Sequence, residues 1–402
     1  MKCLLVIPVL WGGSATPEMT KPEYWPSSDE VILEADEISR YNASLLEEGT
    51  LDLYDILSAE PEVSGEVVRS AIKGYTIPES YTYLDSRKAG PEMKKEILDA
   101  RNLEAVPSVV KIRYGVVTSP ADLRSFPTRT TCTDDGIVRG SLCFDDFQQT
   151  RLWLGEGVLI WHQSRDGKWF FVRARNYAGW VEAADIGLCT GESMRSFLRS
   201  PRFGVALEHR LADVAGRPVR VMMGTRLPRD PSSGVLLAPV RRMDGSLSVV
   251  PAQTDLEFSD GYLPYTTRNV LRQAFRLLGV PYSWGGAEGY NDCSATLLSV
   301  YYCFGIELPR NSSSMRRMVR GNRGRSHHGL QPGSIAVFPG HAMMYLGEKD
   351  GEVFILHDVN ALYDSHHVKD QRSCTLVSST SDVYRKTGVS YADAMTNFIE
   401  VR

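Results

Sequence analysis

The sequence predicts a multidomain chain with a helical N-terminal segment, two small β-barrels in tandem and a C-terminal α+β domain. The 402 residues are enough for about two to four domains of ~100–200 residues each. Apolar residues follow a helical spacing before position 106, a strand-like spacing from there to about position 260, and a mixed spacing afterwards. These changes in spacing mark the expected domain boundaries.

The composition excludes several classes of protein. Hydrophobic residues make up 43% of the chain and charged residues 23%, as in ordinary globular proteins with a sizeable core. The formal net charge of -4 gives no basic field, so we expect no nucleic-acid partner. No apolar run approaches the ~20 residues of a membrane-spanning helix, so we expect no integral membrane segment. The sequence contains neither a C-x-x-C pair nor an H-E-x-x-H motif, so we expect no metal site and no cofactor.

The first residues resemble a short signal peptide, which we place at 1–15. Lys2 is followed by an apolar run from Cys3 to Trp11 and then by small residues up to Ala15. The alternative is a buried first strand. Export would place the protein in the periplasm or outside the cell.

Residues 21–105 predict a helical clasp or linker that packs on the other domains. Between Asp29 and Leu46 the apolar residues recur at three- and four-residue steps, and Ser28 or Asp29 could cap this helix. Three prolines break the rest into short pieces: Pro61, Pro78 and Pro91.

Two β-rich blocks follow, at 106–190 and 200–260. Short apolar runs alternate with turn signals, of which Arg165–Lys168 and Asp244–Gly245 are the clearest. We expect each block to form a small barrel.

The last block, 262–402, predicts an α+β domain. Thr266 or Thr267 could cap a helix that stops at Gly279, and a second helix runs from about Asp292 to Gly305. Three strands are expected downstream: Ser334–Phe338, Ala342–Leu346 and Val353–Leu356.

Cys293 is the candidate nucleophile. A glycine-rich loop after Pro281 delivers Asp292 and Cys293 to the start of the second helix. Unpaired N–H groups and the positive helix end favour a thiolate there, and a thiolate beside a base is an activated nucleophile. Taken alone, Cys293 could equally be a small buried residue.

Two histidines supply the partners. If the hairpin that follows His341 is symmetric about Lys349, His341 and His357 lie directly opposite each other, with Cβ atoms ~4.5–5.5 Å apart. Such a pair can act as base and orienter. These three residues predict acyl transfer or amide hydrolysis and leave the substrate open.

These residues resemble the NlpC-type cell-wall cysteine peptidases, which have a pared-down papain-like fold. The resemblance rests on Tyr282, the Asp292-Cys293-Ser294 step, Leu308-Pro309-Arg310, Pro332-Gly333-Ser334, His341 and His357, in that order. The two β blocks resemble the paired bacterial SH3-like domains of one branch of that family, and the helical start resembles its N-terminal clasp.

The resemblance implies hydrolysis of the γ-D-glutamyl-L-diamino acid bond in peptidoglycan stem peptides or murein fragments. Cys293 would form an acyl-enzyme, His341 would act as the base, and His357 would orient it. Tyr282 and the N–H groups of the helix start would hold the oxyanion. Asp292, Ser294 and Arg310 correspond to the family's substrate contacts and cleft.

The branch implied by the resemblance uses its first SH3-like domain to restrict activity to stems with a free N-terminal L-alanine. Tyr177, Asp145 and Asp146 are the candidates for binding that ammonium group. The chain departs from the family pattern at a few positions, and these could weaken charge recognition or reshape the groove: Ala295, Asn311, Met343 and Met344.

Two other functions remain open: a non-catalytic wall-binding protein built on the SH3-like domains, and an amidase or acyltransferase that uses the same Cys-His-His set. The alternative location is the cytoplasm, where the protein would act as a recycling enzyme. Cys132 and Cys143 flank a turn and could form a disulfide, whereas the sequence leaves the oligomeric state and the preferred diamino acid undecided.

Overall fold

The structure is a computed structural model that describes residues 10–49, 51–78, 83–134 and 144–402. The chain divides into two compact units. Unit 1 holds the described residues up to Leu51 together with Leu263–Ser283 and Tyr290–Arg402, and unit 2 holds Asp52–Tyr262 and Trp284–Gly289. In the described part of the chain, no helix combines the length and the apolar character needed to cross a membrane.

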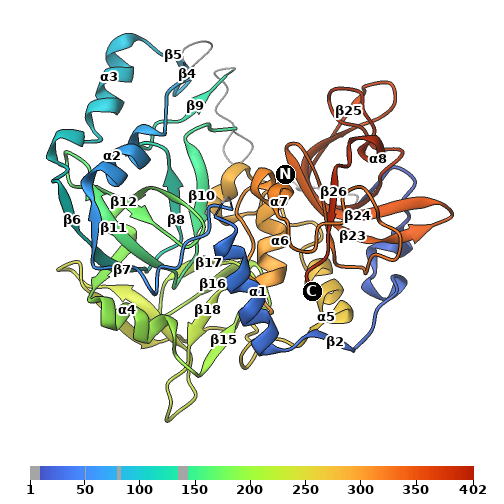
Figure 1. Cartoon of the computed structure of the whole chain (residues 1–402), viewed down its shortest axis with the longest axis horizontal. Coiled ribbons are helices and arrows are strands. Elements are labelled where there is room, and N and C mark those ends of the chain that lie inside the picture. The colour runs from blue at the N-terminus through green and yellow to red at the C-terminus, as the bar shows by residue number, and fades with distance from the viewer. Residues whose placement is uncertain (1–9, 50, 79–82, 135–143) are drawn as a thin grey trace, which may run out of the picture. The chain divides into compact units, whose positions relative to one another are not determined.

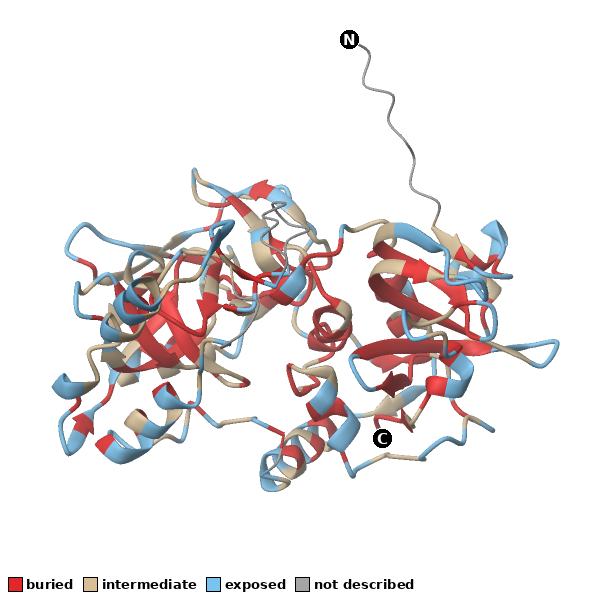
Figure 2. Cartoon of the chain, turned by 90° about the horizontal axis from the view of Figure 1, so that it is seen from above, coloured by how far each residue is buried: buried red, intermediate tan, exposed pale blue. Residues whose placement is uncertain are grey.

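Unit 1 is built on a six-stranded sheet whose order is β1-β25-β24-β23-β22-β26 (Figure 1). All neighbours are antiparallel except β1, which runs parallel to β25. Figure 2 shows these strands as largely buried. Their bounds are β1 Trp11–Gly12, β22 Ile335–Phe338, β23 His341–Lys349, β24 Glu352–Tyr363, β25 Lys369–Ser379 and β26 Asn397–Ile399.

Helices α5 and α6 of unit 1 start where the sequence places their caps. Helix α5 (Thr267–Phe275) is capped by Thr266, whose Oγ1 accepts the Asn269 N–H at 3.1 Å, so Thr266 is the cap of the two candidates. Helix α6 (Cys293–Tyr302) packs against α5, β23 and β24 and is buried on nearly every side, as expected of a central helix. The other short elements are β21 Tyr265–Thr266, α7 Ser312–Arg317 and α8 Tyr391–Ala394.

The hairpin between β23 and β24 differs from the predicted one. Its turn is Asp350–Gly351, where both residues have positive φ (54° and 79°), as a two-residue type I′ turn requires. Near the turn Lys349 pairs with Glu352, but beyond a bulge at Leu346 the register shifts, and Met344 pairs with Leu356. The prediction of symmetry about Lys349 was therefore wrong.

This register makes the two histidines diagonal neighbours. Continuing the ladder past Met344 and Leu356 places His357 across from Met343, two residues from His341 on the same face of the sheet. Without the bulge, the register set at the turn would put His357 on the opposite face.

The N-terminal part of unit 1 carries helix α1 (Ala35–Glu47). The predicted caps Ser28 and Asp29 were wrong: Glu34 caps α1 in a reciprocal box with Glu37. The chain before α1 is extended instead, because β2 (Val31–Leu33) pairs with β21.

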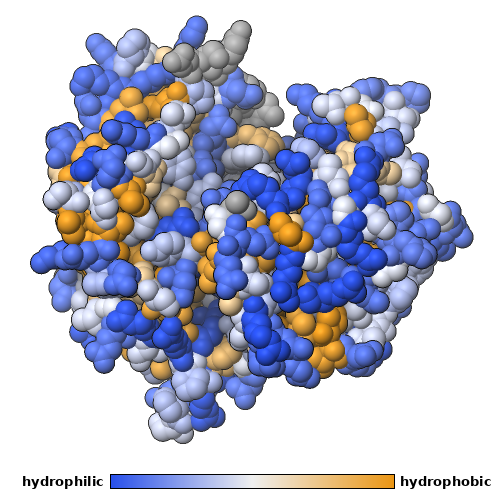
Figure 3. Space-filling view, in the orientation of Figure 1, coloured by the Kyte–Doolittle hydropathy of each residue, from blue (hydrophilic) through white to orange (hydrophobic). Residues whose placement is uncertain are grey.

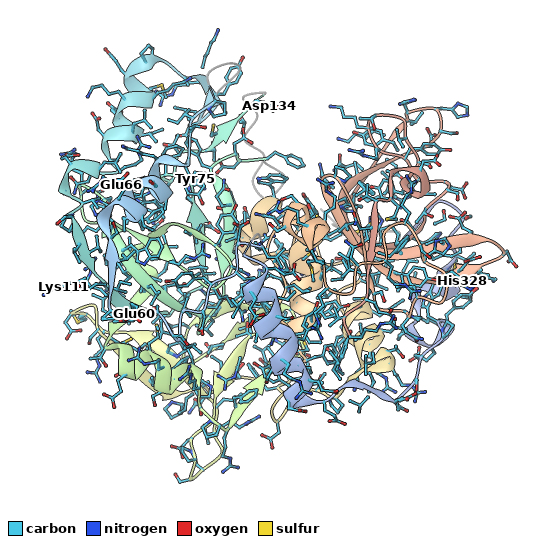
Figure 4. All side chains as sticks on the ribbon, viewed as in Figure 1. Glu60, Glu66, Tyr75, Lys111, Asp134 and His328 are labelled. Atoms are coloured by element: carbon cyan, nitrogen blue, oxygen red, sulfur yellow. The ribbon has the colours of Figure 1, made fainter. Side chains whose placement is uncertain are left out.

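The predicted helical segment 21–105 is divided between the two units. Helix α1 belongs to unit 1, whereas α2 (Gly65–Lys73) and α3 (Pro91–Asp99) belong to unit 2. Figure 4 shows Glu66 and Tyr75 near the two ends of α2, and the Tyr75 hydroxyl donates to the Ala178 carbonyl at 2.5 Å.

The extreme N-terminus is described only from residue 10. Trp11 and Gly12 form β1 and pair with Val377 and Ser378. These two residues therefore lie in a first strand, which is the alternative to a signal peptide. Residues 1–9 lie outside the described part, and the signal peptide stays a prediction.

Unit 2 contains a seven-stranded sheet of order β10-β8-β13-β12-β11-β7-β14, formed by the first predicted β block. The hairpin predicted at Arg165–Lys168 is confirmed, because it joins β11 to β12 with Gly167 N–H donating to Ser164 O. The strands are β7 Arg113–Val117, β8 Ala121–Arg124, β10 Gln148–Leu152, β11 Gly157–Gln163, β12 Trp169–Arg173, β13 Ala178–Glu182 and β14 Ile186–Cys189.

The second β block of unit 2 consists of three two-stranded ladders. The turn predicted at Asp244–Gly245 joins the last two strands. A second SH3-like barrel remains a prediction. The ladders pair β15 Phe203–Val205 with β18 Arg226–Pro228, β16 Arg210–Asp213 with β17 Pro218–Val221, and β19 Leu237–Arg241 with β20 Leu247–Pro251, and helix α4 (Gly191–Leu198) precedes them.

The surface carries both polar and apolar residues. Large apolar side chains that are exposed, such as Met243 and Val67, are distributed singly along the described chain. Figure 3 shows hydrophilic residues over most of the displayed face, interrupted by apolar groups.

Smaller ladders complete unit 2. They are β3 Glu62–Ser64 with β6 Val109–Lys111, and β4 Tyr83–Leu84 with β5 Arg87–Lys88 and β9 Cys132–Thr133.

Candidate active site

Cys293 is the first residue of α6, as predicted. Asp292 caps the helix by accepting the Ala295 N–H at 2.9 Å, and its backbone is extended, so the chain turns sharply into the helix at Cys293. Cys293 is only partly buried, whereas Cys303 at the other end of α6 is fully buried. As a whole residue, Cys293 is therefore less buried than Cys303.

The Cys293 sulfur lies at the start of β23. The backbone N–H of Ala342, the residue after His341, donates a hydrogen bond to the Cys293 sulfur. The start of α6 and the start of β23, where His341 lies, thus meet at the thiol.

The two histidines are hydrogen bonded to each other. His341 Nε2 lies 2.8 Å from His357 Nδ1, and His357 Nε2 lies 3.0 Å from Ser378 Oγ. For His341 to accept a proton from the thiol, its Nδ1 must be bare and its Nε2 must carry the hydrogen. His341 Nε2–H then donates to His357 Nδ1, and His357 Nε2–H donates to Ser378 Oγ, so every nitrogen of the pair has a role.

Sequence reasoning missed two residues of this arrangement, Ser378 and Tyr391. Ser378 on β25 closes the hydrogen-bonded chain, and Tyr391 on α8 packs edge-on against both imidazoles at 5.7 Å between ring centroids. Phe338 contacts His341 and Tyr391 and completes the wall around the rings. No local motif marks Ser378 or Tyr391, because both reach the site only through the fold.

Burial keeps both histidines neutral. It lowers the pKa of His341 to about 3, and it holds the pKa of His357 well below the usual value, with His341 as a further cause. Both bases are therefore unprotonated at neutral pH, which is the form that can receive a proton.

Burial also raises the pKa of the Cys293 thiol to about 12, and the Asp292 carboxylate adds to the rise, although the Ala342 N–H opposes it. The prediction of a resting thiolate at the helix start was therefore wrong. Burial thus favours the neutral forms of both the thiol and the His341 imidazole.

Asp292, Ser294 and Arg310 form one buried cluster beneath the nucleophile. The Arg310 guanidinium donates to both carboxylate oxygens of Asp292, at 3.0 and 2.6 Å, and to Ser294 Oγ at 2.8 Å. Burial acts to raise the pKa of Asp292, but Arg310 and the hydrogen bonds from Ala295 and Ser294 hold it below the usual range. The three predicted contacts are thus joined to one another.

Tyr282 is buried close to this cluster. Burial raises the pKa of its hydroxyl well above the usual value, and Cys293 and Asp292 add to the rise. The phenol therefore keeps its proton and can donate it to a developing negative charge.

The other predicted contacts belong to unit 2. The Tyr177 hydroxyl donates to Gln149 Oε1 at 2.8 Å. The carboxylate of Asp145 is buried, accepts the N–H groups of Cys132 and Phe147, and pairs with Arg124 at 2.8 Å.

Asp146, by contrast, is exposed. Partial loss of solvent around its carboxyl, with Asp134 and Asp145 nearby, nevertheless raises its pKa. Cys132 is a free thiol, and its predicted partner Cys143 lies outside the described residues.

The glycine-rich loop has a structural requirement within unit 2. Gly285 has a φ of 61°, and a Cβ there would come within 2.8 Å of Gln148 Cγ on β10. Gln148 Nε2 also donates to the Gly285 carbonyl at 3.2 Å. The close approach that glycine permits at position 285 is therefore to β10.

The remaining histidines do not form a site. His327 faces Glu348 at 3.3 Å, and His328 is exposed in the loop before β22 (Figure 4). Across the described ranges, no group of three or more His, Cys, Asp or Glu side chains could hold a metal ion.

Comparisons with known proteins agree with this architecture. Residues 139–182 match the family model of the SH3 domain of SH3b1 type, and residues 279–373 match that of the NlpC/P60 family. The chain therefore contains an SH3b domain followed by a C-terminal NlpC/P60 domain, so the predicted family resemblance and fold class are confirmed.

Individual relatives are more distant. Over 83 residues the chain is 34% identical to a probable endopeptidase of Mycobacterium tuberculosis (strain H37Rv) and to one of Mycobacterium bovis. The match covers 20% of this chain and 21% of either relative, so the chain spans about a fifth of their length. A solved NlpC/P60 endopeptidase from Photobacterium damselae subsp. piscicida superposes with a TM-score of 0.75 at 18% identity, covering 98% of both chains, and has the same fold.

The neutral state of His341 makes a prediction about pH. The imidazole must be unprotonated to act as a base. Because its pKa is lowered, it stays unprotonated even at pH values below about 6.5, the usual pKa of a histidine. We expect kcat/KM to stay constant from about pH 7.5 to about pH 5.5, checked by initial rates with circular dichroism at each pH. A fall centred near pH 6.5 in folded enzyme would contradict the assignment.

The buried ion pair makes a prediction about stability. Replacing Arg310 by Met leaves the Asp292 carboxylate buried without its partner, which should lower the free energy of unfolding by ~3–5 kcal/mol in urea titrations. Arg316→Met, at an exposed position on α7, is the matched control and should change it by less than ~0.5 kcal/mol. Equal effects of the two variants would show that the Asp292–Arg310 pair is not the source of the loss.

Proposed function

We propose that this chain is a cysteine endopeptidase that hydrolyses the γ-D-glutamyl-L-diamino acid bond of peptidoglycan stem peptides. One observation carries the proposal: the Cys293 thiol at the start of α6 accepts the Ala342 N–H, and the preceding residue, His341, begins a hydrogen-bonded chain through His357 to Ser378. The resemblance to NlpC-type peptidases supplies the substrate class.

The first half-reaction uses the neutral thiol. As Cys293 Sγ attacks the carbonyl carbon of the γ-glutamyl group, the thiol proton passes to His341 Nδ1. The positive charge that forms on His341 is shared through His357 and Ser378, which hold the ring in place. The backbone N–H groups at the start of α6, which have no partner within the helix, and the Tyr282 hydroxyl stabilise the oxyanion.

The second half-reaction regenerates the enzyme. When the tetrahedral intermediate collapses, the carbon–nitrogen bond breaks, and His341 returns its proton to the departing amine of the diamino acid. A thioester to Cys293 remains. His341 then takes a proton from water as the hydroxide adds to the thioester. The carbon–sulfur bond breaks, His341 gives its proton to the departing Cys293 sulfur, and the product with a free γ-carboxyl group is released.

The proposal includes a requirement for a free N-terminal L-alanine, which the branch resemblance implies. This requirement favours murein fragments over intact wall as substrates. The SH3b domain supports action on wall-derived material, and we place the enzyme in the periplasm or outside the cell.

The test is cleavage of the tripeptide L-Ala-γ-D-Glu-diaminopimelate, with the lysine analogue in parallel. We expect release of L-Ala-D-Glu by the full chain and a loss of at least ~10³-fold in Cys293→Ala. Cys189→Ala removes another partly exposed thiol, on β14, and should keep the wild-type rate. Release is followed by mass spectrometry.

Two outcomes would contradict the proposal. Cleavage by Cys293→Ala would exclude the thiol as nucleophile, and failure of the wild-type chain to cleave either tripeptide would exclude the substrate class. Acetylating the terminal alanine should lower the rate sharply, and an unchanged rate would contradict only the requirement for a free amine.

A further inference from the structure

Asp358 is a buried acid that the proposed reaction does not use. It follows His357 on β24, and the alternation of side chains along a strand turns it to the opposite face of the sheet, towards α6. Its side chain is fully buried and its Oδ2 accepts the Thr296 hydroxyl at 3.3 Å. An acid at such a site needs a physical explanation.

The contact with Thr296 joins two elements of the active site. Thr296 lies one turn after Cys293 on α6, and Asp358 is the residue next to His357 on β24. The hydrogen bond therefore links the helix that carries the nucleophile to the strand that carries the orienter.

The surroundings of Asp358 suit a neutral acid. The register of β24 and β25 places Thr375 directly opposite Asp358, and both side chains are fully buried. Among the described residues, neither Asp358 Oδ1 nor Thr375 Oγ1 has a hydrogen-bond partner. The Val359 N–H and the Thr296 hydroxyl both favour the ionised acid, but a buried carboxylate whose Oδ1 has no donor would still be costly, whereas the protonated acid has a proton to give to an oxygen such as Thr375 Oγ1.

The charged and titratable groups near Asp358 also disfavour its ionisation. They are Tyr282, Asp292, Cys293 and Cys374. Each of these groups is neutral when protonated and negative when deprotonated, so none of them can supply a positive charge to stabilise an ionised Asp358. The nearby cation is Arg310, and its guanidinium is bonded to Asp292. Burial first, and then the Asp292 carboxylate, hold the pKa of Asp358 well above its usual value.

We propose that Asp358 is a positioning residue that works as a neutral carboxylic acid: it braces α6 against β24, and holding its proton keeps a second negative charge away from Cys293. Ionisation of Asp358 at alkaline pH adds that charge beside Asp292 and disfavours the thiolate. This inference rests on the proposed role of Cys293 as nucleophile, but its test needs no peptide substrate.

The test measures how fast iodoacetamide alkylates Cys293, by peptide mass spectrometry, from about pH 6 to about pH 10. Asp358→Asn keeps the shape of the acid and cannot ionise. We expect this variant to match the wild type near pH 6 and to react about tenfold faster at the alkaline end of the range, once Asp358 of the wild type ionises. Asp350→Asn, on the exposed turn of the same hairpin, should follow the wild type throughout.

Thr296→Val provides an independent arm if Asp358→Asn does not fold. The Thr296 hydroxyl favours the ionised form of Asp358, so its loss should raise the pKa of Asp358 further. In the wild type, alkylation becomes slower than in Asp358→Asn above a certain pH. When Thr296 is replaced by Val, the pH at which this slowing begins should be higher by about half a unit or more.

Parallel profiles of wild type and Asp358→Asn over the whole range would overturn the proposal. So would a Thr296→Val profile that is unchanged or shifted to lower pH. A purely structural role would lower the stability of the variants without changing the pH dependence, so thermal unfolding is recorded alongside. Failure of the tripeptide assay would leave these outcomes readable, because alkylation reports on the thiol alone.

Discussion

The hydrogen bond between His341 Nε2 and His357 Nδ1 is the constraint on which the rest of the site depends. It occupies one nitrogen of His341 and so leaves Nδ1 as the only atom that can take the thiol proton. The bond exists because the bulge at Leu346 shifts the β23–β24 register by one residue and brings both imidazoles to one face. A backbone irregularity several residues from the chemistry thus decides whether the base is oriented.

Burial sets the electrostatics of the site. It favours neutral forms for His341, His357 and Cys293, so in the proposed reaction the proton moves from the thiol to His341 during attack. One charged pair is retained, between Asp292 and Arg310, because its bidentate geometry compensates for lost hydration. A neutral Asp358 keeps a second anion out of the same region and ties α6 to β24.

Much of this site could be predicted from the sequence, because its signals are local. An Asp-Cys-Ser step after glycines marks a capped helix start, and Thr266 and the Arg165–Lys168 turn were read in the same way. The pairing of the two histidines was predicted wrongly for two reasons. The turn lies at Asp350–Gly351 rather than around Lys349, and the bulge at Leu346 has no local signature in the sequence. Ser378 and the ionisation state of Cys293 depend on distant packing and burial, which no spacing along the chain encodes.

The most direct test of the account is the tautomer of His341. Nitrogen-15 NMR of imidazole-labelled protein at about pH 7 reports which ring nitrogen carries hydrogen. The account predicts a neutral His341 with hydrogen on Nε2 and a bare Nδ1, and a neutral His357 with hydrogen on its own Nε2. Hydrogen on Nδ1 of His341, or a doubly protonated ring at that pH, would contradict it, because neither form can take a proton from Cys293.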